Sequence, residues 1–295
     1  MARPSPLPQP PTCLPPSPPV ARPGLRLPAG SCDSHCHVFA AQEDHPFFAG
    51  RAYTPSIVTL DDYIGVMAAF GIDRAVLVQP SIYGTDNAVL LDALARLPDR
   101  LRGVVVIPPD APDSELDRLH AAGVRGIRIN RRNPGGLPLS AIQDLGQRIA
   151  RLGWHLQLQI EVEATPDLAR LVAGAGVPVV IDHFGFCRPE QGPDAPGFRS
   201  LLWLVGNGLC WVKLSAPYRL AAGATGQAAL QPFVESLIQA GADRLLWATD
   251  WPHTECYDRV PDDADLVTLV DTWLPTPELR RKVLIDNPSR LYWNP

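Results

Sequence analysis

The chain has 295 residues, of which 46% are hydrophobic, so it is long enough to bury a large core. Its formal net charge of −5 argues against a nucleic-acid or membrane-surface binder, because such proteins usually carry an excess of basic residues. No apolar run reaches the ~18 residues that indicate a membrane span, and the amino-terminal stretch lacks the uninterrupted apolar core of a signal peptide.

The amino-terminal segment, residues 1–29, contains eleven of the 33 prolines. Proline fixes φ and removes a backbone donor, so this stretch is a poor partner for a sheet. We expect a proline-rich, disordered tail, followed by one catalytic domain at residues 30–295. A proline-rich ligand for a partner domain is the alternative.

From Cys32 onward, short apolar runs rich in β-branched residues alternate with helical patterns. The predicted strands are Cys32–Phe39, Ala75–Gln79, Gly103–Ile107, Val124–Asn130, His155–Glu161, Val177–His183, Cys210–Ser215 and Leu245–Asp250. Eight β-then-α units predict an α/β fold, a single (β/α)8 TIM barrel, with a doubly wound open sheet as the alternative. No G-x-G-x-x-G motif follows the first strand, which disfavours a dinucleotide-binding fold.

Helix starts between these strands are marked by capping residues. Thr59 with Asp62 predicts a capping box, in which each side chain binds the other's backbone N–H. Thr165 and Thr276 each precede a proline, which is typical of an N-cap followed by the first helical residue. Asp113 is a further predicted N-cap.

The six cysteines form no C-x-x-C pair, and a chain of this length does not need a disulfide scaffold. We therefore expect reduced thiols and a cytoplasmic location. The cysteines are Cys13, Cys32, Cys36, Cys187, Cys210 and Cys256.

Polar residues gather at the carboxyl ends of the predicted strands, which is where barrels of this type hold their active sites. They are His35, His37, Gln79, Arg128, Asn130, Gln159, Glu161, Asp182, His183, Lys213, Ser215 and Asp250, with His253 shortly after. Burying such groups costs free energy unless they are paired or used, so their convergence predicts a functional rim.

His35 and His37 are two residues apart on one strand, so both imidazoles face the same side. This arrangement suits one metal ion or one substrate oxygen, although two hydrogen-bonded core histidines would give the same pattern. His183 and Asp250, each at a strand end, favour the functional interpretation. Asp250 suits a general base that takes a proton from water, or a metal ligand.

Arginines near the same rim indicate an anionic substrate, because guanidinium groups bind carboxylates with two hydrogen bonds. Arg128 ends a buried strand and Arg219 follows another, whereas Arg131 and Arg132 could equally be exposed loop charges. His253 could contribute to the site or lie in a surface loop.

Three further residues carry side chains that could serve either function or structure. Lys213 could orient a substrate or pair with a buried acid. His120 and His155 fall away from the rim, and we interpret both as structural.

Several motifs resemble those of the amidohydrolase-related lactonases, and among them the 2-pyrone-4,6-dicarboxylate lactonases. The motifs are Cys32–Phe39 (CDSHCHVF), Arg51–Pro55 (RAYTP), Ile181–Gly185 (IDHFG), Trp247–His253 (WATDWPH) and Asp286–Tyr292 (DNPSRLY). The resemblance covers residues 31–294.

The resemblance implies a role for each matching residue. His35, His37 and His183 would polarise a lactone carbonyl, and Asp250 would activate the attacking water. The residues implied or expected to bind substrate are Tyr53, Gln79, Arg128, Gln159, Arg219 and His253. Gln159 and Phe186 replace a tyrosine and an arginine of the dicarboxylate lactonases, which indicates a less charged or differently substituted substrate.

Many members of the superfamily bind a divalent ion through similar residues. The resemblance allows one zinc or manganese ion on His35, His37, His183 and Asp250. Arg128 and Asn130 stand where a two-metal site would need other ligands, which disfavours a second ion. Metal-free catalysis, with protonated imidazoles as the electrophile, is the alternative.

The predicted function is hydrolysis of a lactone, a cyclic ester with a carboxylate or another anionic group, as in the breakdown of aromatic compounds. The alternatives are a sugar-lactone hydrolase, a lactone isomerase, a metal-dependent non-oxidative decarboxylase, and a barrel that only binds a ligand. The lack of a histidine at the end of the fifth strand disfavours the decarboxylase. The expected partner is a small anionic molecule, without nucleic acid or membrane, and a homo-oligomer is left open.

Overall fold

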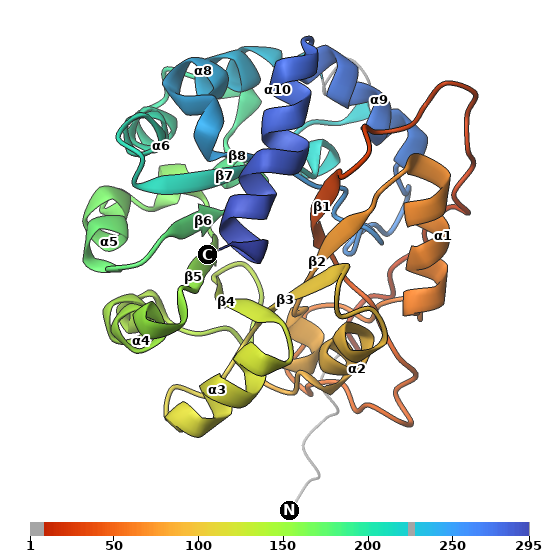
Figure 1. The fold of residues 1–295 in the computed structure, drawn as a ribbon, viewed down its shortest axis with the longest axis vertical. Helices are drawn as coiled ribbons and strands as arrows, with labels where there is room; N and C mark the ends of the chain where they lie inside the picture. The colour runs from red at the N-terminus through yellow and green to blue at the C-terminus, as the bar shows by residue number, and fades with distance from the viewer. Residues whose placement is uncertain (1–8, 224–227, 295) are drawn as a thin grey trace, which may run out of the picture.

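The computed structural model describes residues 9–223 and 228–294. Its centre is one parallel sheet of eight strands in sequence order, surrounded by helices (Figure 1). The strands are β1 Cys32–Cys36, β2 Arg74–Val78, β3 Leu101–Val105, β4 Val124–Asn130, β5 His155–Gln159, β6 Val179–Ile181, β7 Cys210–Leu214 and β8 Leu245–Trp247. A backbone bridge between Cys36 and Trp251, just after β8, brings the first and last strands together. The predicted TIM barrel is confirmed.

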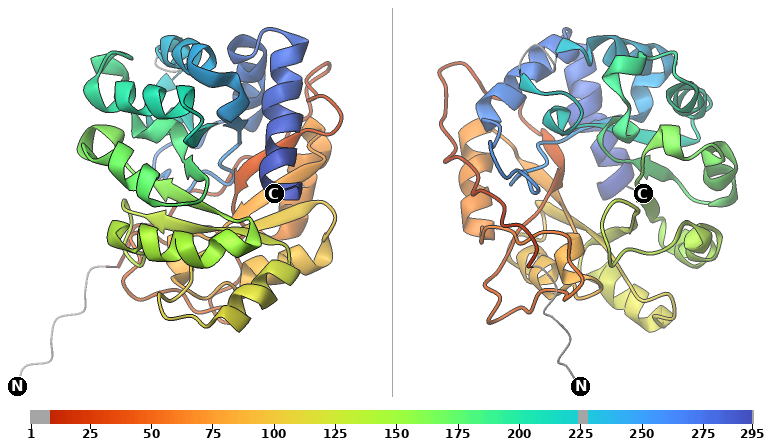
Figure 2. Two further views of the ribbon diagram at one scale, coloured as in Figure 1. Left: turned by 60° about the vertical axis from the view of Figure 1, so that its left-hand side comes forward. Right: turned by 180° about the vertical axis from the view of Figure 1, so that it is seen from behind.

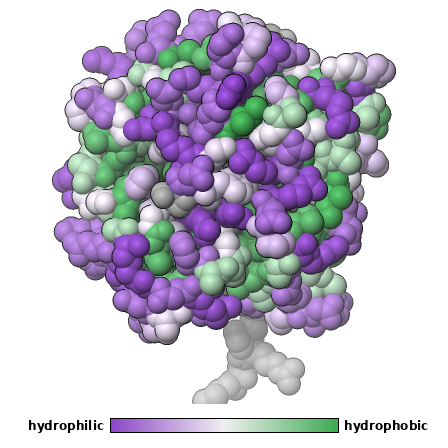
Figure 3. All heavy atoms as spheres, viewed as in Figure 1, coloured by the Kyte–Doolittle hydropathy of each residue, from purple (hydrophilic) through white to green (hydrophobic). Residues whose placement is uncertain are grey.

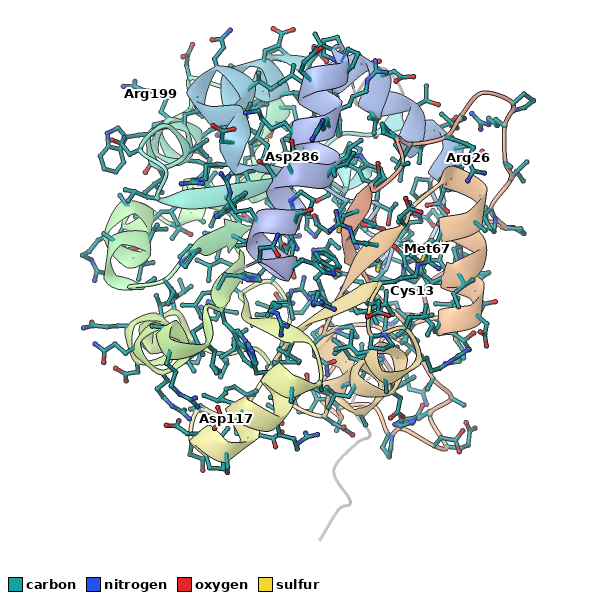
Figure 4. The ribbon with its side chains drawn as sticks, in the orientation of Figure 1. Cys13, Arg26, Met67, Asp117, Arg199 and Asp286 are labelled. Atoms are coloured by element: carbon teal, nitrogen blue, oxygen red, sulfur yellow. The ribbon has the colours of Figure 1, made fainter. Side chains whose placement is uncertain are left out.

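The helices lie outside the barrel, and the carboxyl-terminal helical segment, which starts with α10 and continues to Trp293, crosses one end of it (Figures 1 and 2). They are α1 Leu60–Phe70, α2 Ala88–Arg96, α3 Asp113–Ala121, α4 Ile142–Ile149, α5 Leu168–Gly174, α6 Pro196–Gly206, α8 Gln231–Gly241, α9 Asp263–Trp273 and α10 Pro277–Arg281. Charged side chains such as Asp117 and Arg199 point away from the barrel (Figure 4). Hydrophilic residues cover much of the face in Figure 3, with apolar residues scattered among them. No described helix is long and apolar enough to cross a membrane.

Two of the four predicted helix caps are confirmed. Thr59 and Asp62 form the capping box of α1, and Thr276 accepts from the Leu279 N–H at the start of α10. Thr165 is not a cap, because its hydroxyl donates to the Glu161 carbonyl and α5 begins only at Leu168. Asp113 is also not an N-cap. It is the first residue of α3, where its negative charge interacts favourably with the positive end of the helix dipole.

The described part of the amino-terminal segment, residues 9–29, corrects the expectation of a disordered tail. The N–H of Cys13 donates to the Thr54 carbonyl at 2.8 Å, and that of Leu14 to the Cys256 carbonyl at 2.8 Å. The non-proline residues of this segment thus supply the backbone N–H donors that the prolines lack. The Cys13 side chain is buried. This segment therefore joins the loop after β1 to the loop after β8. Residues 1–8 of the predicted tail lie outside the described residues.

Candidate active site

A narrow pocket opens at the carboxyl ends of the strands, where the predicted rim lies. It is lined by His37, Tyr53, Ser81, Arg128, Asn133, Gln159, His183, Arg219, Asp250, Thr254 and Glu255. These residues come from β4, β5 and the loops that follow six of the strands. The fold therefore brings together residues separated by more than two hundred positions in the sequence.

Asp250 lies at the centre of this pocket, and its two oxygens have different surroundings. Oδ2 accepts from the Tyr218 hydroxyl at 2.6 Å and from Arg219 Nε at 2.7 Å. Oδ1 is buried and has no hydrogen-bond partner among the described residues. It lies 3.7 Å from Nε2 of His35, 3.8 Å from Nε2 of His37 and 3.7 Å from Nε2 of His183. One carboxylate oxygen thus faces three imidazoles and takes part in no hydrogen bond with the part of the chain that the structure describes.

The other nitrogen of each imidazole is held by the protein. His37 Nδ1 donates to the Val78 carbonyl at 2.7 Å, and His35 Nδ1 lies 3.2 Å from Asp182 Oδ1. Because a carbonyl oxygen only accepts, the first contact places the proton of a neutral His37 on Nδ1, whereas His35 Nδ1 also lies 3.2 Å from the donor Lys213 Nζ. The lone pair on His37 Nε2 then faces Asp250 Oδ1. His183 Nδ1 is similarly engaged, 2.8 Å from the Ser215 hydroxyl.

Electrostatics favour neutral imidazoles beside an ionised carboxylate. Burial lowers the pKa of His37 to about 3 and that of His183 to about 4, and it holds the pKa of His35 well below its usual value. Burial alone would raise the pKa of Asp250, but Arg219 and the neighbouring imidazoles bring that pKa well below its usual range. At neutral pH the site therefore carries one central negative charge.

The loops of the site are held in backbone conformations that non-glycine residues rarely adopt. The φ angles are 50° at His183, 47° at Phe186, 61° at Asp250 and 63° at Glu255. Such conformations cost free energy and persist where the surrounding contacts enforce them, commonly at functional sites. Here Asp33 contributes, because its carboxylate accepts from the backbone N–H groups of both His35 and Thr249 at 3.1 Å.

Arg128 presents an unused donor at the pocket. Its Nη1 donates to the Gln79 carbonyl at 3.2 Å and its Nη2 to Gln159 Oε1 at 2.6 Å. Arg128 Nε and the Ser81 hydroxyl are buried and have no partner among the described residues. A buried donor without a partner costs free energy, so both atoms are suited to bind a substrate oxygen.

Lys213 and Asp182 form a buried ion pair beneath the imidazoles, with Nζ 3.4 Å from Asp182 Oδ1. The same Nζ donates to Gln157 Oε1 at 2.8 Å. Burial lowers the pKa of Lys213 to about 8, whereas Lys213 and His35 hold the pKa of Asp182 well below its usual range despite burial. The pairing interpretation of Lys213 is thus the one that the geometry favours.

Some residues of the predicted rim point away from the pocket. The Gln79 side chain donates to the Asp86 carbonyl at 2.6 Å. His253 is fully buried rather than in a surface loop, and its Nε2 lies 2.9 Å from Asp263 Oδ1. Arg132 pairs with Glu161, and Arg131 is exposed.

Other residues of the site were not predicted from the sequence. They are Ser81, Asn133, Tyr218, Thr254 and Glu255, all in the connections that follow strands, with Ser81 and Tyr218 in short 3-10 helices. The one available signal was the position of Tyr218, directly before Arg219 after a strand end. Arg219 itself has every guanidinium nitrogen paired within the protein: Nε with Asp250, Nη2 with Thr254 at 3.0 Å and Nη1 with Glu255 at 3.3 Å.

The amino-acid sequence matches that of a known protein family. The amidohydrolase family pattern matches residues 32–293. The chain belongs to the amidohydrolase family. It is 36% identical to the 2-pyrone-4,6-dicarboxylate hydrolase of Comamonas testosteroni, over 92% of this chain and 93% of that protein. It is 34% identical to the 4-sulfomuconolactone hydrolase of Hydrogenophaga intermedia, over 96% of this chain and 95% of that protein.

A solved structure shows the same fold as this amidohydrolase. A probable 2-pyrone-4,6-dicarboxylic acid hydrolase from Acinetobacter baumannii, crystallised with citric acid bound, superposes with a TM-score of 0.80. The two proteins are 29% identical, and the match covers 90% of this chain and 99% of that one.

Proposed function

We propose that this amidohydrolase opens a lactone ring by hydrolysis and that its substrate carries an anionic group. The observation that carries the proposal is Asp250 Oδ1, a buried carboxylate oxygen that no described residue uses and that faces three imidazoles. Two relatives that align over nearly the whole chain are hydrolases of a 2-pyrone dicarboxylate and of a muconolactone, which supports a lactone as the substrate.

The proton steps follow from the position of Asp250. A water molecule next to Oδ1 gives its proton to that oxygen as it attacks the lactone carbonyl. The carbonyl carbon becomes tetrahedral, and the ring C–O bond then breaks. The same carboxyl returns its proton to the departing ring oxygen, which leaves a hydroxy acid or its enol. Tyr218 and Arg219 hold Oδ2 throughout, so that Oδ1 stays directed at the water.

The residues present fit a divalent cation. His35, His37 and Asp250 offer one ligand atom each, all within 4.8 Å of one another, and His183 Nε2 faces the same carboxylate oxygen. Nitrogen and oxygen ligands of this kind suit zinc or manganese. When bound, such an ion polarises the carbonyl and increases the acidity of the water. The lowered pKa values of His37 and His183 argue against the metal-free alternative, which requires protonated rings.

An anionic group of the substrate would bind on the side of Arg128. Arg128 Nε and the Ser81 hydroxyl are the unused donors there, and the Tyr53 side chain lines the same pocket. The related hydrolase from Acinetobacter baumannii has citric acid, an organic acid, bound, which supports an anionic ligand. The free thiols of all six cysteines support a reducing compartment, the cytoplasm.

The test is elemental analysis of the purified protein together with assays of lactone hydrolysis before and after chelation. Hydrolysis releases a proton, decarboxylation releases carbon dioxide, and isomerisation releases neither, so one panel of substrates separates the alternatives. We expect about one zinc or manganese ion per chain, loss of activity on chelation and recovery on adding the ion back. Full activity in metal-free protein would reject the metal but keep the hydrolase. No proton release from any lactone by the metal-loaded protein would reject lactone hydrolysis.

A further inference from the structure

Glu255 is an acidic residue on the wall of the pocket, on the loop after β8, and no step of the proposed hydrolysis uses it. Its φ angle of 63° is one that a glutamate rarely adopts, so its backbone is held by neighbouring contacts. One of them is with the amino-terminal segment, because the Glu255 N–H donates to Cys13 Sγ at 3.2 Å. The structure thus holds a carboxylate in a fixed place beside the reaction centre.

The charges of the pocket are unevenly distributed around Asp250. Arg219 also lines the pocket, but each of its three nitrogens already donates to a protein partner: Nε to Asp250, Nη2 to Thr254 and Nη1 to the Glu255 carboxylate. Arg128 is the other arginine that lines the pocket, and its Nε has no partner among the described residues. One side of the pocket therefore offers donors to an anion, whereas the side of Glu255 offers a carboxylate.

We propose that Glu255 is a specificity-determining residue that restricts the site to lactones with a single anionic group. This inference rests on the proposed lactone hydrolysis and specifies its substrate class. When Arg128 binds the first carboxylate of a substrate, a second carboxylate on the opposite side of the ring would lie toward the wall of the pocket that contains Glu255. Like charges at close range inside a protein repel strongly, so a dianion binds poorly there. A hydroxyl group of the substrate at the same place instead donates to Glu255.

The kinetic test compares two lactones that share one ring and differ by one carboxylate, 2-pyrone-6-carboxylate and 2-pyrone-4,6-dicarboxylate. We expect the wild-type protein to prefer the monoanion in kcat/KM. The variant Glu255→Gln keeps the size of the side chain and removes its charge, and it should move the preference toward the dianion by about tenfold or more. A preference that changes by less than about twofold would overturn the proposal.

A matched control separates this effect from a loss of support for Arg219. Thr254→Val also removes a hydrogen bond to Arg219 and lines the same pocket, but it changes no charge. It should slow both lactones by the same factor. If Thr254→Val shifts the preference as much as Glu255→Gln does, Glu255 acts only by holding Arg219, and the proposal is wrong.

Binding measurements keep the inference testable if the reaction is not lactone hydrolysis. Calorimetry with Asp250→Asn, with and without Glu255→Gln, gives Kd for both pyrones in the absence of turnover. If Glu255→Gln lowers the Kd of the dicarboxylate relative to that of the monocarboxylate, the inference is supported. This holds even if the wild-type protein releases no proton from any lactone. An unchanged ratio overturns it, even if lactone hydrolysis is demonstrated.

Discussion

Replacing Asp250 with asparagine tests the centre of the proposed chemistry. The amide has the shape of the carboxylate but cannot accept a proton from water under the assay conditions. Its oxygen can still accept from the Tyr218 hydroxyl and Arg219 Nε, which now bind Oδ2 at 2.6 and 2.7 Å. The change therefore removes the unused oxygen Oδ1 as a base while preserving the contacts that orient the side chain.

The size of the expected effect follows from these contacts. General-base catalysis by a positioned side chain contributes about 10²–10⁴-fold, so kcat should fall by at least about 100-fold. Arg219 loses one of its two ionic partners but keeps the other, Glu255, at 3.3 Å, and Thr254 at 3.0 Å. Weakening one charge-assisted hydrogen bond costs about 1–3 kcal/mol, so the protein should stay folded at room temperature.

The assay is proton release from the lactone that the wild-type protein turns over fastest, with urea unfolding as the measure of stability. Tyr218→Phe is the control, because it removes one contact to Oδ2 and leaves the base in place. It should lower kcat by about tenfold or less, as expected for one lost neutral donor. If Asp250→Asn keeps more than a tenth of the wild-type kcat, Asp250 is not the base.

Three further outcomes are expected. Arg128→Ala should raise KM for an anionic lactone at least about tenfold more than for a neutral one, since it removes a charged donor; equal effects in steady-state kinetics would exclude the anion-binding role. His155 lies outside the pocket against Tyr292, and burial lowers its pKa from 6.5 to about 3. Its contribution to stability is therefore present above pH 6.5 and is lost as pH falls from 6.5 toward 3, by roughly 5 kcal/mol in all. His155→Gln should flatten the fall in unfolding free energy between pH 7 and 4, and an identical pH slope would contradict this. Removing residues 1–14 should lower kcat/KM about tenfold or more by freeing the loops that carry Tyr53 and Glu255, and unchanged kinetics would show that Cys13 and Leu14 do not position them.

Much of the fold was predictable because it depends on repeating patterns. Eight apolar runs separated by helical segments can close only in a few ways, and their predicted positions agree with the observed strands within a few residues. The convergence of His35, His37, His183 and Asp250 was predictable for the same reason: the carboxyl ends of parallel strands in a barrel meet on one face.

The loops were less predictable, because their conformation depends on contacts distant in sequence. Tyr218 reaches Asp250 from the loop after β7, and Glu255 reaches the pocket through a positive φ angle that its residue type does not indicate. The composition of the amino-terminal segment predicted disorder, yet Cys13 and Leu14 find backbone partners in two loops that only the closed barrel brings together.

The sequence indicated Asp250 as the base, and the partners of the two strand-end carboxylates supply the physical reason. Asp182 uses both oxygens inside the protein, since Oδ1 lies 3.2 Å from His35 Nδ1 and Oδ2 accepts from Gln157 at 3.1 Å. Asp250 uses only Oδ2. Both carboxyl groups are buried, and charged neighbours hold both pKa values low, so acidity does not separate them. The two residues differ in whether an oxygen is available. Of the two, Asp250 has an oxygen free to take a proton from water, whereas Asp182 holds the His35 ring in place.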